Sequence, residues 1–132
     1  MLIILSVIVV GIAVAVGIAM FSDSSIDSNR DGLTNDLTAL ASRAHQYYRR
    51  PLYFNGGGNS FAGLTADAAG LSKLTNKPKN DNGTYSIVTA GSGTGINATV
   101  EILGVGNQTF NGALVSVRVR VYSDRDSVWV VN

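Results

Sequence analysis

The fold of this chain is decided by its first stretch, MLIILSVIVVGIAVAVGIAMF, which runs from Met1 to Phe21. Every residue in it is apolar or glycine except Ser6, and none carries a charge. A helix of this length is about 30 Å long, which matches the hydrocarbon core of a bilayer. In a dry environment a lone segment satisfies its backbone hydrogen bonds only as a helix. The stretch therefore predicts a helix that lies in a membrane or in an equally dry protein assembly.

The residues around this helix do not match a secretory signal peptide. Such a peptide carries a basic region, a shorter apolar run and a small-residue cleavage site, whereas the first basic residue here is Arg30. Two explanations stay open. The stretch is a single-pass anchor with unusual flanking charges, or it begins a mature form whose basic leader was removed before Met1.

Residues 22–50 predict an amphipathic continuation of the same helix. Their apolar side chains recur at helical spacing and form one stripe, and Pro51 predicts the end of the helix. A continuous helix of about 50 residues is about 75 Å long, too long for a small head to bury. We therefore expect its first half to pack against lipid or other subunits. The stripe consists of Ile26, Leu33, Leu37, Leu40, Ala44 and Tyr47 or Tyr48.

The charges of residues 22–50 are ordered along the predicted helix. Acidic residues occupy its start, from Asp23 to Asp36, and basic residues occupy its end, from Arg43 to Arg50. This order suits a helix dipole, because the N-terminal end of a helix is positive and its C-terminal end is negative. Carboxylates and guanidinium groups arranged in this way are expected to form pairs within the helix or between subunits.

A calcium loop is an alternative for part of this segment. The sequence DSNRDG places Asp27, Asn29 and Asp31 at positions 1, 3 and 5, with glycine at position 6, as an EF-hand-type loop does. Position 12 is Thr38 in place of the bidentate glutamate, and Arg30 lies inside the proposed cage. The pattern therefore favours an ordinary helix, or a break in the helix, over a metal site.

The rest of the chain predicts a small head. Residues 51–82 predict a Gly-rich loop region with a short helix or irregular cover over 65–74, and residues 83–132 predict an antiparallel sheet. Its clearest signal is the alternation of valines with polar residues from Val115 to Val121. Turn signals such as Asn111-Gly112 favour a meander. The four expected strands are 85–89, 97–103, 115–122 and 127–131.

The predicted fold class is α+β, with a long N-terminal helix packed on a C-terminal antiparallel β-sheet of about four strands. The apolar first half of the helix, residues 1–21, stays outside the head, while the amphipathic second half covers one face of the sheet. The side chains expected in the head core are Leu33, Leu37, Leu40, Ala44, Tyr48, Val115, Val117, Val119 and Val121.

Composition excludes several classes of function. The net charge is only +1, so nothing suggests a nucleic-acid partner. Cysteine is absent, which excludes disulfides, thiolate metal ligands and cysteine nucleophiles within these 132 residues. His45 is the only histidine, and the sequence indicates no nucleophile that would act with it. We expect no enzymatic activity and no cofactor.

Three Asn-x-Thr triplets are candidate glycosylation sites in an exported protein. They begin at Asn82, Asn97 and Asn107. In a chain rich in Asn, Gly and Thr such triplets also arise by chance, so the sequence leaves modification open.

The apolar N-terminal helix, its amphipathic continuation, the loop and the C-terminal sheet together resemble type IV pilins. The stretch from Leu2 to Ala13 is similar to the start of a mature pilin. The resemblance implies a structural subunit of an extracellular filament that serves adhesion, motility or surface contact. It also implies a subunit held in the inner or cytoplasmic membrane before assembly, and a prepilin peptidase and pilus assembly machinery as partners.

The chain departs from the family pattern at three points. Leu5 stands where most bacterial type IV pilins carry a glutamate, Met1 replaces the usual aromatic residue, and no C-terminal disulfide can form. The pairing of that glutamate with a neighbour's N-terminal amine is therefore in doubt. A divergent bacterial pilin, an archaeal-like pilin and a mature start a few residues upstream all remain open.

Assembly of identical subunits into a helical filament would remove the apolar helix from water. At about 25 cal/mol per Å² of apolar area, this burial is worth on the order of tens of kcal/mol per subunit before entropy costs. Contacts that do not close on themselves produce helical polymers. Gly11 and Gly17 resemble small-residue positions where helices approach closely. The expected filament-core residues are Leu2, Ile4, Leu5, Ile8, Val9, Gly11, Ile12, Val16, Gly17 and Met20.

A single-pass membrane protein with an exported β-rich binding domain is the alternative function. It needs the same apolar helix, but as an anchor in lipid instead of a filament core.

Overall fold

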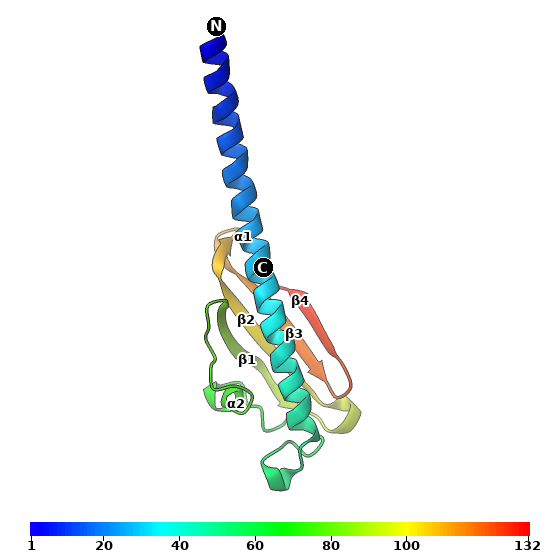
Figure 1. Ribbon diagram of the computed structural model, residues 1–132. Helices are drawn as coiled ribbons and strands as arrows, with labels where there is room; N and C mark the ends of the chain where they lie inside the picture. Colours follow the sequence, from blue (N-terminus) through cyan, green and yellow to red (C-terminus); the bar gives the residue numbers. More distant parts are fainter.

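The computed structural model describes the whole chain, from Met1 to Asn132, and shows one long helix packed on a four-stranded antiparallel sheet (Figure 1). Helix α1 spans Leu2–Arg49 without a break. Its first half projects away from the head, and its second half lies across one face of the sheet. The predicted α+β fold class is confirmed.

The sheet is a simple meander in the order β1-β2-β3-β4, with every neighbouring pair antiparallel. The β2–β3 hairpin turns at Asn111-Gly112, whose φ angles of 51° and 80° are those of the two-residue turn that the sequence predicted. The elements after α1 are η1 (Leu52–Phe54), α2 (Ala68–Ser72), β1 (Gly83–Ser92), η2 (Gly95–Asn97), β2 (Thr99–Phe110), β3 (Ala113–Tyr122) and β4 (Asp126–Val130).

The first two strands are longer than the sequence analysis predicted. Strand β1 extends past residue 89 to Ser92 and β2 extends past residue 103 to Phe110. Glycines interrupt both extensions and hide the strand pattern. Gly91 is needed there, because a Cβ at this position would lie 1.7 Å from the backbone oxygen of Phe61. The backbone of the loop region thus crosses directly against the end of β1.

The head core joins the helix stripe to the inner face of the sheet. Leu33, Leu37 and Ala44 are fully buried, and so are the four valines of β3 from Val115 to Val121. Tyr48 differs from its prediction as a core residue, because it is only partly buried at the edge of the core. Its ring packs on Phe61 with centroids 5.1 Å apart. Tyr48 lies at this edge because its hydroxyl reaches out to donate to the carbonyl of Gly95 at 3.1 Å.

The calcium-loop alternative is wrong, because residues 27–36 lie inside α1. In a helix Asp27 and Asp31 share one face while Asn29 lies on the opposite side, so the three cannot surround one ion as loop ligands do. Asn29 instead ties α1 to the head: its Nδ2 donates to Asn82 O at 2.8 Å. Its Oδ1 accepts from the backbone N–H of Asn107 at 2.9 Å.

Candidate functional site

The most prominent surface of the molecule is the projecting half of α1. Every side chain from Met1 to Phe21 is exposed, and the large apolar ones are between 52% and 101% accessible. Isolated apolar residues on a surface are ordinary, but a contiguous apolar surface of this length marks an interface with protein or membrane. By length and composition this helix could span a membrane.

The helix is well suited to an environment without water. Its one polar side chain, Ser6, donates its hydroxyl to the carbonyl of Leu2 at 2.9 Å, so no side-chain polar group needs an outside partner. The predicted filament-core residues Leu5, Ile8 and Val9 are 57%, 53% and 59% exposed in the single subunit. Nothing in this chain packs against them, so their partners must be lipid or other chains.

The two glycines of this half have no role inside the subunit. A Cβ at Gly11 or at Gly17 would meet no atom within 4 Å. Glycine in a helix interior costs about 1 kcal/mol relative to alanine. No contact within the chain explains why glycine occupies either position. Both positions are consistent with close approach of a neighbouring helix.

A second set of contacts fixes the other half of α1 to the head. The carboxylate of Asp36 accepts hydrogen bonds at one oxygen from Asn80 at 2.9 Å, from Asn82 at 2.8 Å and from the hydroxyl of Tyr85. Burial raises the pKa of Asp36, but the hydrogen bonds from Asn82, Tyr85 and Asn80 outweigh it and lower the pKa overall. Asp36 is therefore ionised at neutral pH and holds the loop and β1 against the helix.

The outer face of the sheet carries one ordered ion pair. Arg120 donates through Nε and Nη2 to one oxygen of Glu101, at 2.8 and 2.6 Å. Thr89 donates to the other oxygen at 2.5 Å. The Thr89 hydrogen bond, and then the Arg120 contacts, lower the pKa of Glu101 although burial raises it. This cluster locks three strands together and leaves no group free for acid–base chemistry.

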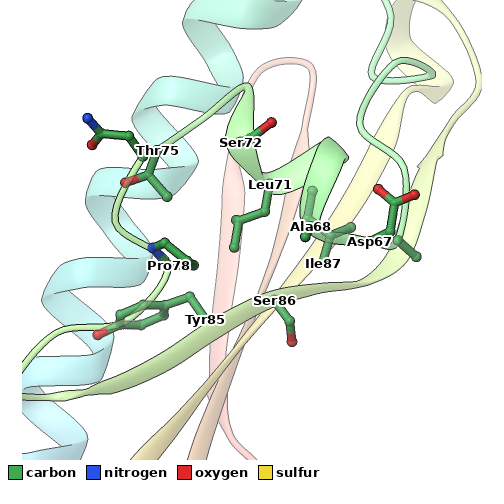
Figure 2. Close-up of a pocket in the computed structure, with 11 residues that line it drawn as sticks. Asp67, Ala68, Leu71, Ser72, Thr75, Pro78, Tyr85, Ser86 and Ile87 are labelled. Atoms are coloured by element: carbon green, nitrogen blue, oxygen red, sulfur yellow. The ribbon is translucent and has the colours of Figure 1, made fainter.

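A small apolar hollow lies on the flank of the head between α2 and β1 (Figure 2). Its volume is about 280 Å³, slightly below the range of about 300–1,000 Å³ that holds cofactors and drug-sized ligands. Figure 2 shows Leu71 pointing from α2 into the space between Pro78 and Ile87. The one carboxylate that lines the hollow belongs to Asp67, the N-cap residue of α2, and it accepts a hydrogen bond from the backbone N–H of Gly70 at 2.8 Å. The hollow has the size and lining for a side chain or a small apolar molecule.

His45 lies half-exposed beside an open hollow that is also lined by Ser42, Gln46, Arg49 and Asp124. A nucleophile and its base must lie within hydrogen-bonding reach of each other. No hydrogen bond joins Ser42, His45 and Asp124, so these three residues are not arranged as a catalytic triad.

The three candidate glycosylation sites differ in accessibility. The amide nitrogen of Asn82 is bound to Asp36, and that of Asn107 donates to the carbonyl of Asp81 at 2.6 Å. Asn97 lies exposed in η2. Modification at Asn82 or Asn107 would break a contact of the head, whereas Asn97 is open to modification.

No family model, curated protein or solved structure matched this chain. Its function must therefore be argued from the molecule itself.

The sequence analysis missed the hydrogen bonds that hold the rod to the head. Asp36 lies 44 to 49 residues from its three partners, and periodicity carries no information about contacts over such separations. Asn80 and Asn82 belonged to the predicted loop region, and Asn82 was singled out only as a candidate glycosylation site. The exposed apolar half, by contrast, was found directly, because it depends on a single uninterrupted stretch.

Proposed function

We propose that this chain is the structural subunit of an extracellular type IV pilus-like filament. The apolar halves of many copies bundle in the filament core, and the β-rich heads form the outer surface, which serves adhesion, motility or surface contact. The observation that carries the proposal is the fully exposed apolar half of α1, rigidly continuous with a helix that is anchored in a folded head.

The proposal includes a life cycle in two environments. Before assembly the apolar half lies in the inner or cytoplasmic membrane, since its length and composition suit a bilayer. On assembly the same surface passes from lipid to neighbouring copies, so it is never exposed to water. By its resemblance to type IV pilins, the chain would depend on a prepilin peptidase and pilus assembly machinery. The role is structural and not enzymatic.

The test is imaging of material sheared from cells that express the chain, combined with N-terminal sequencing of the recovered subunit. We expect fibres built from this subunit with its apolar stretch intact. A matched variant, Ile8→Asp, places a charge in the proposed core and should abolish the fibres, whereas Thr38→Asp on an exposed position of the head should not. Discrete particles without fibres from the wild-type chain would refute the proposal.

A single-pass anchored protein with an exported binding domain is the second candidate. The apolar hollow beside Leu71 and Ile87 is the observation that favours it, because a binding domain needs a pocket. Under this function, detergent extracts the chain only as small particles and the wild-type chain forms no cell-surface fibres. Ser86→Trp, at an exposed position that lines the hollow, should then block ligand capture without unfolding the head.

A further inference from the structure

At the end of the head farthest from the N-terminus, α1 ends and the chain turns back (Figure 1). This end carries unpaired cations beside an exposed apolar turn. We call this surface the distal pole and define it by Arg49, Arg50 and η1 (Leu52–Phe54). None of the three ion pairs in the subunit includes Arg49 or Arg50. The side chains of Leu52, Tyr53 and Phe54 are 73%, 91% and 65% exposed.

The distal pole is held in a fixed shape. The loop after η1 folds back on the end of α1, where Gly57 N donates to Tyr47 O at 2.7 Å and Gly58 N donates to Arg50 O at 3.0 Å. Gly57 has no room for a side chain, because a Cβ there would lie 1.9 Å from the backbone oxygen of Ser60. A rigid turn that presents aromatic side chains to solvent is typical of a protein interface.

The opposite end of the head is acidic and polar. We call it the proximal pole and define it by Asp23, Asp27, Asp81 and a hollow of about 440 Å³ where α1 leaves the head. Asp23 and Asp81 form no ion pair, and the pair of Asp27 with Arg30 is long, at 3.6 Å. The hollow has no apolar lining and is formed by Ser24, Ser25, Ser28, Asn29, Asp81, Asn82, Asn107 and Gln108.

The two halves of α1 are of similar length. The part packed on the head runs from Ile26 to Arg49, about 36 Å, and the apolar part from Met1 to Phe21 is about 31 Å long. A second copy shifted by one head length toward the N-terminus brings its distal pole to the proximal pole of the first. The same shift places the second head alongside the apolar half of the first copy.

We infer that successive heads stack head to tail, with the distal pole of one copy docked on the proximal pole of the next. This inference rests on the proposed function and names the contact that sets the register of the filament. Arg49 and Arg50 face Asp23 and Asp81, because guanidinium forks suit carboxylates and amide oxygens. The contact joins different surfaces of identical chains, so it does not close on itself.

The charge contacts set register, while the apolar halves supply strength. Exposed ion pairs stabilise a contact only weakly, far less than burial of the apolar helix does. Like charges brought together at the same contact, however, disfavour the wrong alignment. Reversal of one pole should therefore weaken assembly measurably without unfolding the head.

The test uses two full-length variants purified in detergent and assembled by detergent removal. Arg49→Glu/Arg50→Glu makes the distal pole acidic, and Asp23→Arg/Asp81→Arg makes the proximal pole basic. Each variant alone brings like charges together at every contact, whereas a one-to-one mixture can alternate and pair opposite charges at every contact. Lys77→Glu/Lys79→Glu, at two exposed positions on the flank of the head, is the control for the net charge of the distal-pole variant.

We expect the concentration needed for assembly to rise about tenfold for each variant alone and to return near the wild-type value in the mixture. Circular dichroism of the detergent-solubilised variants checks that the head is folded. If wild type assembles and the reversed variants assemble equally well, or if mixing restores nothing, the head-to-tail contact is refuted while the filament stands. If wild type itself forms no filament, both proposals fail.

Discussion

At the scale of single residues, Asp36 makes the most concentrated contact between the rod and the head. One carboxylate oxygen accepts from Asn80, Asn82 and Tyr85, which come from the loop region and from β1. Charge-assisted hydrogen bonds are about twice as strong as neutral ones, and removal of one partner leaves the others unsatisfied. Asp36 is thus the side chain on which attachment of the loop region to α1 most depends.

Replacement of Asp36 should destabilise the head. We expect Asp36→Ala to lower the free energy of unfolding by about 1–3 kcal/mol, since it leaves the hydroxyl of the buried Tyr85 without its acceptor and removes the contacts to Asn80 and Asn82. Denaturant unfolding in detergent, followed by tryptophan fluorescence of Trp129, measures the change. Asp31→Ala, on an exposed position of the same helix, is the matched control and should stay within about 0.5 kcal/mol of wild type.

The contribution of Asp36 should also depend on pH. Its pKa in the folded head is lowered from 3.8, so folding favours the ionised form. The contribution is therefore fully present above pH 3.8 and is lost as the pH falls through the folded-state pKa. We expect the stability difference between wild type and Asp36→Ala to be constant from pH 5 to 7 and to shrink in acid below pH 3.8. A difference that grows in acid would contradict this account.

At the scale of elements, the stability of the head depends on the apolar side chains of α1 that pack against the sheet. Leu37 is fully buried in this stripe, and removal of a buried leucine side chain costs about 2–5 kcal/mol. We expect Leu37→Ala to lower the free energy of unfolding by that amount. Leu52→Ala removes the same atoms from a side chain that is 73% exposed and should change stability little.

Substitution of the two glycines in the apolar half should test assembly without changing the stability of the head. No atom of the subunit approaches a Cβ at Gly11 or Gly17 within 4 Å, so Gly11→Leu and Gly17→Leu should leave the unfolding of the head unchanged. In a filament core, where helices approach closely at small residues, each should reduce the yield of fibres severalfold. Ile12→Leu keeps the volume and serves as the control. Normal fibre yield from both glycine variants would show that neither position lies at a close helix contact.

Local periodicity predicted the elements with strong repeating patterns. The buried faces of the helix from Leu33 to Ala44 and of β3 could be predicted from the spacing of their apolar residues. This spacing follows the helical period in the first case and the strand period in the second. The extension of β2 to Phe110 was hidden by Gly104 and Gly106, whose lack of side chains erases the alternation. Gly104 is needed because a Cβ there would lie 2.9 Å from the ring of Tyr85, a contact that only the tertiary structure reveals.

The calcium loop, which the sequence analysis kept only as a disfavoured alternative, shows how a short local pattern can mislead. The spacing from Asp27 to Asp31 matched loop ligands, but burial of Leu33 and Leu37 on the same segment keeps it helical. Gly32 lies where the Asn82 side chain crosses the helix, since a Cβ would come within 2.8 Å of that side chain. The glycine that suggested a loop turn instead provides room for a neighbour.

At the scale of the whole molecule, the structure consists of two parts with opposite needs. The head has a core of 20 buried residues and hydrogen-bonded attachments to α1, whereas the projecting half has no buried residue at all. One unbroken helix joins them, so the position of the head fixes the position of the apolar surface. In the proposed filament, this rigid coupling would let stacked heads align a core of apolar helices.

The chain is suited to a direct measurement because it contains no cysteine. A single thiol can be introduced in the apolar half by Val9→Cys or on the exposed head surface by Asn97→Cys, and each reports the access of water at its own position. Filaments sheared from cells and freed of lipid are treated with a water-soluble maleimide, with urea-dissociated subunits as the reference for full reactivity.

Our account predicts that the thiol of Val9→Cys is protected in the intact filament and reactive after dissociation, whereas the thiol of Asn97→Cys reacts in both states. Equal labelling at the two positions in intact filaments would contradict the account, because it would place the apolar half of α1 in water instead of among its copies.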